Sequence, residues 1–503
     1  GVNWSHPMIK EFVERHDRKI HRWLEILPGF VSWNLILFPI WGSFVFPEVI
    51  AYLVLAFDVL WLYKSATAGF AAWASHSRIE QAEKTDWQAL AEKLPGVEKV
   101  HHIVLIPTAN EPTYIIERTL ENLTRQSCQP KKNLTVVLAL EARVEINKIR
   151  GETLQKKYAD NFAHIFSTLH YLSPGEVVGK SSNESFAGRW IKQKLVDELG
   201  YDINYLTITT ADSDMIFHRQ YFSYLTREFL LNRNRYRRFW QGAVVFYNNI
   251  WRIPAPSRVV NTLNTVWQMA QLSRKDRLIN YSTYSASLKM MDEVGFWDTD
   301  VIPEDYRIFF KCFFQLKGKV EVEPIFLTIS GDAAESTNFA NTLKNQYLQQ
   351  QRWAWGVSDD PLFIKWWLTR TEIPFWDRTI RVFKVLLDHF FWPVNWLIIT
   401  LGANLPLILN PKFSQTILGQ QLPKVSSFIL TLCLGFLMLM IYIDNRHRPA
   451  NSVKASFPKR LLSFSEWLLM PITGFFLGAL PGIDAHTRLM FGKYLEYRVT
   501  EKV

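Results

Sequence analysis

Residues 205–214 read Tyr-Leu-Thr-Ile-Thr-Thr-Ala-Asp-Ser-Asp, an apolar and β-branched run that leads directly into two carboxylates. β-Branched residues in so short a run predict a buried strand. Asp212 and Asp214 then stand at its carboxyl end, where two like charges are costly unless a cation joins them. Their oxygens suit Mg²⁺ or Mn²⁺ bridging a diphosphate. Capping of a following helix is the alternative role for the pair.

Other apolar, β-branched segments surround this strand and alternate with helical patterns. The predicted strands are 102–107, 134–140, 165–172, 205–210, 239–246 and 320–328, and the predicted helices are 112–125, 181–198, 219–232 and 305–315. Such alternation predicts a mostly parallel α/β sheet, which binds ligands at the carboxyl ends of its strands. No apolar run between residues 80 and 370 is long enough to span a membrane, so this region is expected to fold as a soluble domain.

The composition of the whole chain excludes two broad classes of protein. Of 503 residues, 48% are hydrophobic and 21% are charged, and 57 Lys and Arg stand against 47 Asp and Glu, a net charge of +10. This hydrophobicity is too high for a disordered chain, and the charge is too high for a chain made only of membrane helices. Three cysteines without metal-ligand spacing predict neither a zinc site nor a disulfide framework.

Apolar runs near both ends of the chain predict membrane helices. Two adjoining runs occupy 28–75, and two more occupy 390–409 and 428–444. Each can cross a hydrocarbon core of roughly 30 Å as a helix of roughly 20 residues. The run 464–480 is interrupted by Pro and Gly, so we expect it to form an interfacial or re-entrant helix. The prediction is a multi-pass integral membrane protein with about four transmembrane helices.

The excess of basic residues accompanies these spans. Five precede the first span and five follow the fourth: Lys10, Arg15, Arg18, Lys19, Arg22, Arg446, Arg448, Lys454, Lys459 and Arg460. The positive-inside rule then places these flanks, and the α/β domain, on the cytoplasmic side of a cell inner membrane or plasma membrane. Because the charges lie beside membrane segments, no nucleic-acid partner is expected.

Two further polar motifs lie at strand or helix ends. The first predicted strand ends in Pro-Thr-Ala-Asn-Glu-Pro at 107–112, where Asn110 and Glu111 belong either to a nucleotide site or to an ordinary turn that caps a helix. Glu304 and Asp305 open a predicted helix. A carboxylate at that position caps the helix or removes a hydroxyl proton as a general base.

A third motif follows the α/β segments. Residues 349–353 read Gln-Gln-Gln-Arg-Trp. Arg352 offers a fork of donors for phosphate, and Trp353 offers an aromatic face on which a sugar ring can stack. An amphipathic helix docked on the membrane surface is the alternative.

In their order along the chain, these motifs resemble those of the family 2 membrane glycosyltransferases, the group of cellulose, chitin and hyaluronan synthases. The turn at 107–112 is most similar to the cellulose-synthase branch. The tail at 497–502, Tyr-Arg-Val-Thr-Glu-Lys, resembles the Phe-x-Val-Thr-x-Lys gating loop of that branch. The likeness covers most of residues 99–503 and implies a GT-A catalytic domain, a Rossmann-like mixed α/β sheet.

With this resemblance, the chain divides into nine predicted segments. They are a cytoplasmic amphipathic segment (1–27), two transmembrane helices (28–75), a linker (76–98), the GT-A domain (99–370), an interfacial helix (371–389), a transmembrane helix (390–409), an external loop (410–427), a transmembrane helix (428–444), and a cytoplasmic basic loop with the interfacial or re-entrant helix and the gating-like tail (445–503).

The resemblance also implies roles for individual residues. Asp305, with Glu304 beside it, is the implied catalytic base, and Asp212 and Asp214 lie at a diphosphate and its Mg²⁺ or Mn²⁺. The implied substrate-binding residues are Asn110, Glu111, Glu141, Lys180, Asn183, Asp212, Gln349, Arg352, Trp353, Tyr497, Val499 and Thr500. For Lys180 and Asn183, a solvated helix start is the alternative.

Two positions depart from the family pattern. Glu141 stands where most relatives carry an Asp pair that contacts the nucleoside, which leaves the base of the donor open. Pro303 stands where relatives usually carry Thr, but both following carboxylates are retained.

The implied activity is inverting transfer from a nucleotide-diphosphate sugar, with UDP the expected nucleotide, to elongate a β-linked polysaccharide at the cytoplasmic face and to pass it outward. The alternatives are transfer of one sugar to a lipid or lipid-linked acceptor and a catalytically inactive membrane scaffold. The implied partners are the donor, a glycan or lipid-linked acceptor, the lipid bilayer, and a second copy of the chain or an export protein. A scaffold has no need of a costly carboxylate cluster.

Overall fold

The structure of the protein is a computed structural model that describes residues 6–450 and 465–497. The chain forms two compact units. The sheet unit comprises Ser75–Ile250, Gln271–Ser336 and Glu496–Val503, and the helical unit comprises Gly1–Ala74, Trp251–Ala270 and Thr337–Leu495.

Among the described residues, the sheet unit contains one sheet of eight strands in the order β3-β2-β1-β4-β7-β6-β8-β5. The strands are β1 (His101–Thr108), β2 (Leu134–Glu141), β3 (His164–His170), β4 (Leu206–Thr210), β5 (Ile216–Phe217), β6 (Arg238–Val245), β7 (Tyr284–Ser287) and β8 (Glu321–Ser330). β1 pairs in parallel with β2 and β4, whereas β7 runs antiparallel to both β4 and β6. The sheet is therefore mixed, which confirms the predicted fold class.

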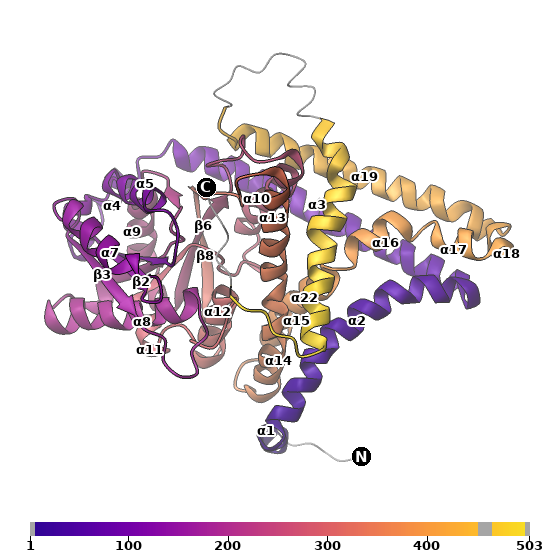
Figure 1. Cartoon of the computed structure of the whole chain (residues 1–503), viewed down its shortest axis with the longest axis horizontal. Helices are drawn as coiled ribbons and strands as arrows, with labels where there is room; N and C mark the ends of the chain where they lie inside the picture. Colours follow the sequence, from indigo (N-terminus) through magenta and orange to yellow (C-terminus); the bar gives the residue numbers. More distant parts are fainter. Residues whose placement is uncertain (1–5, 451–464, 498–503) are drawn as a thin grey trace. The chain divides into compact units, whose positions relative to one another are not determined.

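Helices flank this sheet and bury its central strands (Figure 1). They are α4 (Trp87–Ala91), α5 (Thr113–Thr124), α6 (Pro130–Asn133), α7 (Ile146–Lys157), α8 (Lys180–Lys192), α9 (Tyr221–Leu231), α11 (Leu288–Glu293) and α12 (Glu304–Gln315). Every residue of β1, β2, β4 and β6 is buried, as expected for strands covered on both faces. On α12, Phe309 lies against Phe239 of β6, so apolar packing fixes the helix that begins with Glu304.

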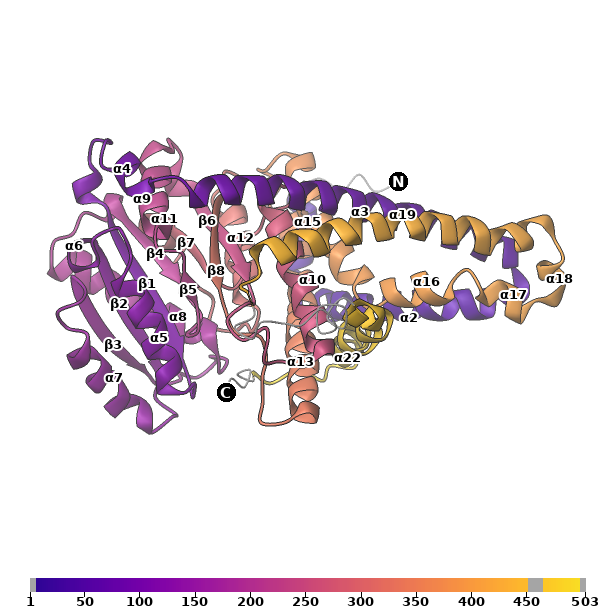
Figure 2. The same cartoon turned by 90° about the horizontal axis from the view of Figure 1, so that it is seen from above.

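All six predicted strands and all four predicted helices are present, with ends displaced by a few residues. The predicted helix 181–198 is α8 followed by a π-helical turn over Gln193–Glu198. Two strands were not predicted. β5 has only two residues, and the Tyr-Ser-Ala-Ser sequence of β7 lacks an apolar pattern. Figure 2 shows β7 and β5 together with β4, β6 and β8 in the same sheet.

The helical unit consists of long apolar helices and several short ones. Its elements are α1 (His6–Arg15), α2 (Asp17–Val45), α3 (Pro47–Glu83), α10 (Ala255–Leu272), α13 (Phe339–Ala354), α14 (Asp360–Thr369), α15 (Phe375–Phe391), α16 (Asn395–Leu401), α17 (Leu405–Leu409), α18 (Pro411–Ser414), α19 (Ile417–His447), α21 (Met470–Gly474) and α22 (Leu480–Met490). The ends of α3, from Ser75, and of α10, from Gln271, belong to the sheet unit. Within the described residues, four helices are long and apolar enough to cross a membrane: Asp17–Val45, Pro47–Glu83, Ile417–His447 and Glu466–Met490. The number agrees with the predicted four, but the set differs: Glu466–Met490 was expected to be interfacial or re-entrant, and 390–409 is not among the four. The bent pair of α15 and α16 would be a fifth if it forms one span.

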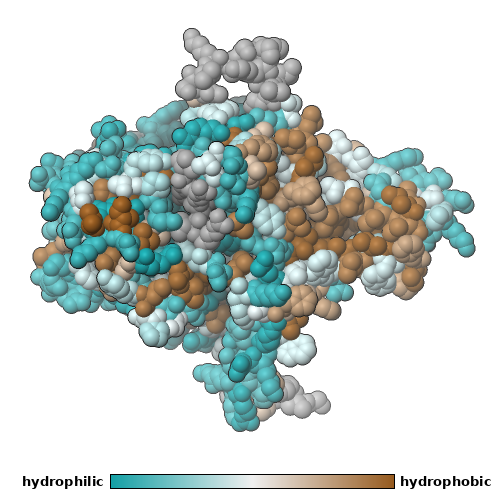
Figure 3. Space-filling model, in the orientation of Figure 1, coloured by the Kyte–Doolittle hydropathy of each residue, from teal (hydrophilic) through white to brown (hydrophobic). Residues whose placement is uncertain are grey.

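The surface of the membrane-length helices is apolar. Figure 3 shows hydrophobic side chains gathered over this part of the molecule. The exposed ones on α19 are Ile417, Val425, Phe428, Leu432, Leu434, Met438 and Tyr442. A run of exposed apolar side chains on one helix is expected where lipid, not water, is the solvent.

The sequence predicted one continuous helix over 390–409, but in the structure this segment is broken. α15 ends at Phe391, and α16 continues at an angle of 55° before α17 begins at Leu405. Pro393 and Pro406 lie at these breaks, and a proline removes a backbone donor and disfavours an uninterrupted helix. Most of the run 464–480 lies in Glu466–Met490, a helix of membrane length that includes a π-helical turn at Phe475–Ala479. Its interfacial or re-entrant role stays a prediction.

Polar contacts join the first and last long helices of this unit. On α2, Ser32 pairs with His486 of α22 at 2.8 Å, and the Trp33 indole donates to Thr487 at 3.0 Å. Arg22 donates to the carbonyl of Leu489 at 2.9 Å, next to the C-terminal end of α22. These bonds hold α2 and α22 against each other.

Candidate functional site

Three parallel strands bring separate polar segments to one edge of the sheet. β1, β2 and β4 end at Thr108, Glu141 and Thr210, and all three point in the same direction. The carboxyl ends of neighbouring parallel strands lie side by side. The turn after β1, the end of β2 and the Asp-x-Asp segment after β4 therefore meet at this edge.

The turn after β1 is held by Asn147, which was not predicted from the sequence, and by Glu111, which was. Asn147 donates to the carbonyl of Ala109 at 2.9 Å and to that of Glu141 at 2.8 Å, which joins the ends of β1 and β2. The Glu111 carboxylate accepts from the Ala109 amide at 2.8 Å. Asn110 lies exposed beside this turn. The Glu141 carboxylate is buried and pairs with Arg143.

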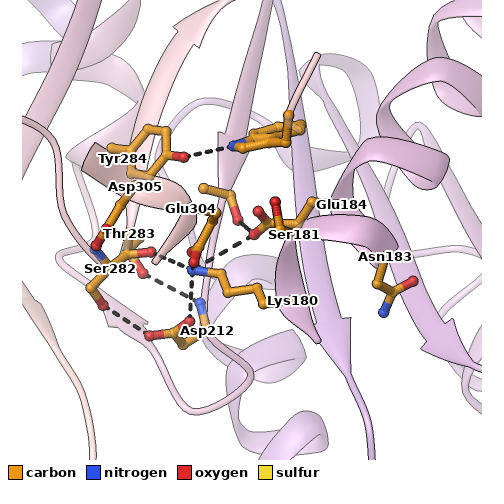
Figure 4. A network of polar contacts seen from close by, with 12 residues as sticks. Lys180, Ser181, Asn183, Glu184, Asp212, Ser282, Thr283, Tyr284, Glu304 and Asp305 are labelled. Carbon is orange, nitrogen blue, oxygen red and sulfur yellow. Dashed lines mark hydrogen bonds and ion pairs between the residues drawn. The ribbon is translucent and has the colours of Figure 1, made fainter. Parts of the chain in front are cut away.

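Lys180, the first residue of α8, lies at the centre of a group of carboxylates (Figure 4). Its Nζ is 2.8 Å from Glu304, 3.0 Å from Asp212 and 3.6 Å from Glu184. It also donates to the carbonyl of Ser282 at 2.8 Å. We call Lys180, Glu184, Asp212, Glu304 and Asp305 the lysine cluster.

In the lysine cluster, attraction between opposite charges offsets the cost of burying them. Burial opposes the charge of the ammonium, but the attraction of Asp212, Glu304 and Glu184 outweighs it and raises the pKa of Lys180 well above its ordinary value. Burial also raises the pKa of Glu184 well above its ordinary value, against the attraction of Lys180. Removing either sign of charge would leave the other buried without compensation.

Asp305 lies at the start of α12 and is half-buried. One of its carboxylate oxygens accepts from the Ser282 amide at 3.0 Å, and the other accepts from the Tyr306 amide at 2.9 Å. Burial, with the negative charge of Glu304, raises the pKa of Asp305 to about 6 despite these bonds. A carboxylate that titrates near neutral pH is suited to general base catalysis.

The two carboxylates of the Asp-x-Asp segment point to different places. Asp212 is 33% exposed and faces Lys180. Asp214 is 1% exposed, and one of its oxygens accepts from the Asp332 amide at 2.7 Å, while Asp332 is paired with Arg118. Asp214 therefore ties the segment to the loop that follows β8.

A divalent metal fits the carboxylate of Asp212. Mg²⁺ is usually held by one or two carboxylates together with substrate phosphates, and Asp212 offers one partly exposed carboxylate at the ligand-binding edge of the sheet. The described residues contain no group of three or more His, Cys, Asp or Glu side chains placed to hold a metal. Phosphate oxygens would therefore have to complete the coordination.

Asn183 lies one turn along α8 but turns away from the lysine cluster (Figure 4). Its amide donates to the carbonyl of Ala139 at 2.6 Å and is buried. This bond joins α8 to β2 and thereby fixes the helix that carries Lys180.

The C-terminal tail places Tyr497 beside the start of α8. Gly179 has a φ of +149°, and a β-carbon built there would lie 2.9 Å from Cδ2 of Tyr497. The ring therefore packs on the backbone immediately before Lys180, and only glycine leaves room for it. Val499 and Thr500 lie outside the described residues.

The remaining predicted site residues, Gln349, Arg352 and Trp353, lie on α13 in the helical unit. Gln349 is buried and accepts from Gln346 at 3.3 Å. Nearby on α13, Tyr347 donates to Asp484 of α22 at 3.2 Å. The role of this motif at a donor or acceptor stays a prediction.

Four residues that hold the site were not predicted from the sequence: Asn147, Glu184, Arg143 and Ser282. Glu184 stands four residues after Lys180, so helical spacing alone could have paired them. Arg143 stands two residues after Glu141, and no pattern marks it. Ser282 lies in a turn whose sequence has no distinguishing feature.

Comparison with known proteins concerns both sequence and fold. Residues 207–443 match the profile of Glycosyl transferase family group 2. No curated protein sequence matches the chain. Among solved structures, the chain is similar to the mannosyltransferase PcManGT from Pyrobaculum calidifontis in complex with GDP-Man and Mn²⁺, with 12% identity over 88% of this chain and 100% of that one and a TM-score of 0.42. It is also similar to GalNAc-T7 with UDP, GalNAc and Mn²⁺, with 9% identity over 59% and 58% of the two chains and a TM-score of 0.35.

Replacing Lys180 by methionine should destabilise the sheet unit by about 3–5 kcal/mol, because it leaves buried carboxylates without their counter-ion. The free energy of unfolding in detergent measures this loss. The control is Lys192→Met on the same helix, whose exposed pair with Asp197 should be worth about 0–1 kcal/mol. Adding Glu184→Gln to Lys180→Met should recover part of the loss. If Lys180→Met and Lys192→Met lowered the free energy of unfolding by the same small amount, the charge balance described for the lysine cluster would be wrong.

Gly179→Ala should displace Tyr497 and also impose backbone strain at a positive φ. Gly175→Ala is the matched control, since Gly175 has a φ of +89° and no atom lies within 4 Å of its would-be β-carbon. We expect Gly179→Ala to lower the free energy of unfolding by about 1–3 kcal/mol more than the control. If the two variants unfold alike, Tyr497 does not pack on Gly179.

Proposed function

We propose that this chain, whose residues 207–443 match the family 2 glycosyltransferases, transfers a sugar from a nucleotide-diphosphate donor to a glycan acceptor with inversion at the anomeric carbon. The observation that carries the proposal is the lysine cluster, which brings Asp212 and Asp305 together from separate motifs. The transfer requires a group at the departing diphosphate and a base at the attacking hydroxyl. The cluster supplies one carboxylate for each task.

Asp305 serves as the base in the proposed reaction. The acceptor oxygen attacks the anomeric carbon and loses its proton to the Asp305 carboxylate, while the bond from that carbon to the diphosphate oxygen breaks. The bonding electrons leave with the diphosphate. Amide donors from Ser282 and Tyr306 hold the carboxylate in place for the proton transfer.

Asp212 and Lys180 are proposed to lie on the side of the departing diphosphate. Asp212 would hold Mg²⁺ or Mn²⁺ together with the diphosphate, and such an ion, when bound, stabilises the charge of the departing phosphates. Lys180 keeps Asp212 and Glu304 within ion-pair distance of one ammonium. It therefore keeps the cluster assembled between turnovers, when no metal ion balances the carboxylates.

The donor nucleotide is proposed to lie along the ends of β1 and β2. Asn110 is exposed there, and Glu141 is held by Arg143. A carboxylate paired with a guanidinium presents both hydrogen-bond acceptors and hydrogen-bond donors to the edge of a nucleobase. UDP stays the expected nucleotide, and a panel of donors tests it.

Elongation of a β-linked polysaccharide is the acceptor chemistry that we favour. Its support is the packing of Tyr497, the first residue of the gating-like motif, on Gly179, the residue before Lys180. Transfer of one sugar to a lipid-linked acceptor is the second candidate, favoured because the described chain has four helices of membrane length, or five if the bent pair of α15 and α16 is one span, and so few helices leave little room to enclose a glycan. In both cases we propose a cytoplasmic catalytic domain on a multi-pass membrane protein.

The deciding experiment supplies the purified protein in lipid with UDP-sugars and GDP-sugars and with Mg²⁺ or Mn²⁺. Nucleotide release and product length are measured together. A ladder of product lengths supports polysaccharide elongation, whereas a single added sugar supports the second candidate. Absence of transfer with every donor and with both glycan and lipid-linked acceptors would contradict the proposal.

Asp305→Asn should lower the rate of transfer by about 10²- to 10⁴-fold, because the amide cannot accept the hydroxyl proton. Nucleotide binding, measured by titration calorimetry, should persist. Asp300→Asn is the control from the preceding loop, since the Asp300 side chain is 65% exposed. Near-normal transfer by Asp305→Asn would refute its assignment as the base.

The rate of transfer should rise with pH through about 6 and then level off, because Asp305 acts only when it is deprotonated and its pKa is raised to about 6. Glu304→Gln should move the midpoint to lower pH, since it removes a negative charge that raises the pKa of Asp305. The measurement is kcat between pH 4.5 and pH 8, that is, roughly two units on each side of the expected midpoint. A flat profile in this range would exclude Asp305 as the titrating base.

A further inference from the structure

Ser282 contacts three members of the lysine cluster at once (Figure 4). Its hydroxyl donates to Asp212 at 2.9 Å, and its amide donates to Asp305 at 3.0 Å. Its carbonyl accepts from the Lys180 ammonium at 2.8 Å. One residue therefore uses its side chain, its N–H and its C=O on three different ionisable groups.

The backbone of Ser282 is left-handed, with a φ of +55°. This conformation is strained for a residue with a β-carbon, whereas glycine adopts it freely. A serine here keeps a hydroxyl that glycine lacks, and that hydroxyl is the group that reaches Asp212. Strained residues persist where the surrounding structure holds them, and they gather at functional sites.

Gln241 of β6 holds the turn on both sides of Ser282. Its side-chain oxygen accepts from the Tyr281 amide at 2.9 Å, and its side-chain nitrogen donates to the Thr283 carbonyl at 3.0 Å. Gln241 is fully buried, so these bonds are shielded from water. Asn280 adds a bond to the Asp305 carbonyl at 2.9 Å, which joins the turn to α12.

We propose that Ser282 is a positioning residue that sets the spacing between Asp212, on the side of the departing diphosphate, and Asp305, on the side of the acceptor hydroxyl. The inference rests on the proposed function and deepens it. Because the hydroxyl acts on Asp212 and the amide acts on Asp305, the two effects of Ser282 can be separated by substitution.

The first test removes the hydroxyl and keeps the amide. Ser282→Ala and Ser282→Gly should each weaken the binding of UDP and of GDP, titrated in the presence of Mn²⁺, by about tenfold, because a bond to a charged group is lost. The pH midpoint of transfer should not move in either variant, since the bond to Asp305 remains. Ser285→Ala is the matched control, because the Ser285 hydroxyl is buried on β7 and pairs with Thr209 at 2.7 Å, away from the cluster.

Two further variants separate positioning from a general loss of structure. Adding Ser282→Ala to Asp212→Asn should cause no further loss of nucleotide affinity if the hydroxyl acts through Asp212. Gln241→Met should release the turn and weaken the amide bond that lowers the pKa of Asp305, so the pH midpoint of transfer should rise.

Unchanged nucleotide affinity in Ser282→Ala, or an equal loss in Ser285→Ala, would overturn the positioning role while the enzyme stayed active. A wild-type protein that neither binds a nucleotide nor transfers a sugar would overturn the proposed function and this inference together.

Discussion

The ammonium of Lys180 is the group on which the arrangement of the site depends. Four segments that are distant in the sequence meet at it, namely the start of α8, the end of β4, the turn before β7 and the start of α12. Each segment contributes a negative or polar group that could not be buried at this edge alone. The charge balance therefore links the fold of the sheet unit to the proposed chemistry, since the groups that suit the proposed reaction also hold one another in place.

The mixed sheet makes this meeting possible. β1, β2 and β4 run in parallel and deliver their carboxyl ends to one edge, as α/β sheets do. β7 enters between β4 and β6 in the antiparallel direction, which brings the turn at Ser282 to the same edge as Asp212. The aromatic packing of α12 on β6 then fixes Asp305 beside that turn. The membrane-length helices belong to the other unit and supply the apolar surface expected of a bilayer protein.

Local patterns predicted the parts of the structure that depend on local interactions. The six strands and four helices carry their own apolar periodicity, and the carboxylates at their ends mark the ligand-binding edge. β7 was missed because its place depends on pairing with β4 and β6, and its own sequence is rich in serine. The left-handed turn at Ser282 depends on Gln241, which is distant in sequence. In the sequence, Asp212 and Asp214 have the same predicted role as metal ligands. Only the folded chain shows that the Asp214 carboxylate accepts from the Asp332 amide in the loop after β8.

We propose that the edge of the sheet beside Lys180 binds a nucleotide diphosphate through Asp212. A structure of the protein determined with UDP or GDP and Mn²⁺ tests it most directly. We predict that the diphosphate and the ion lie against the Asp212 carboxylate, next to Lys180, with the base along the ends of β1 and β2. A nucleotide bound elsewhere, or an Asp212 carboxylate that touches neither phosphate nor metal, would contradict this account.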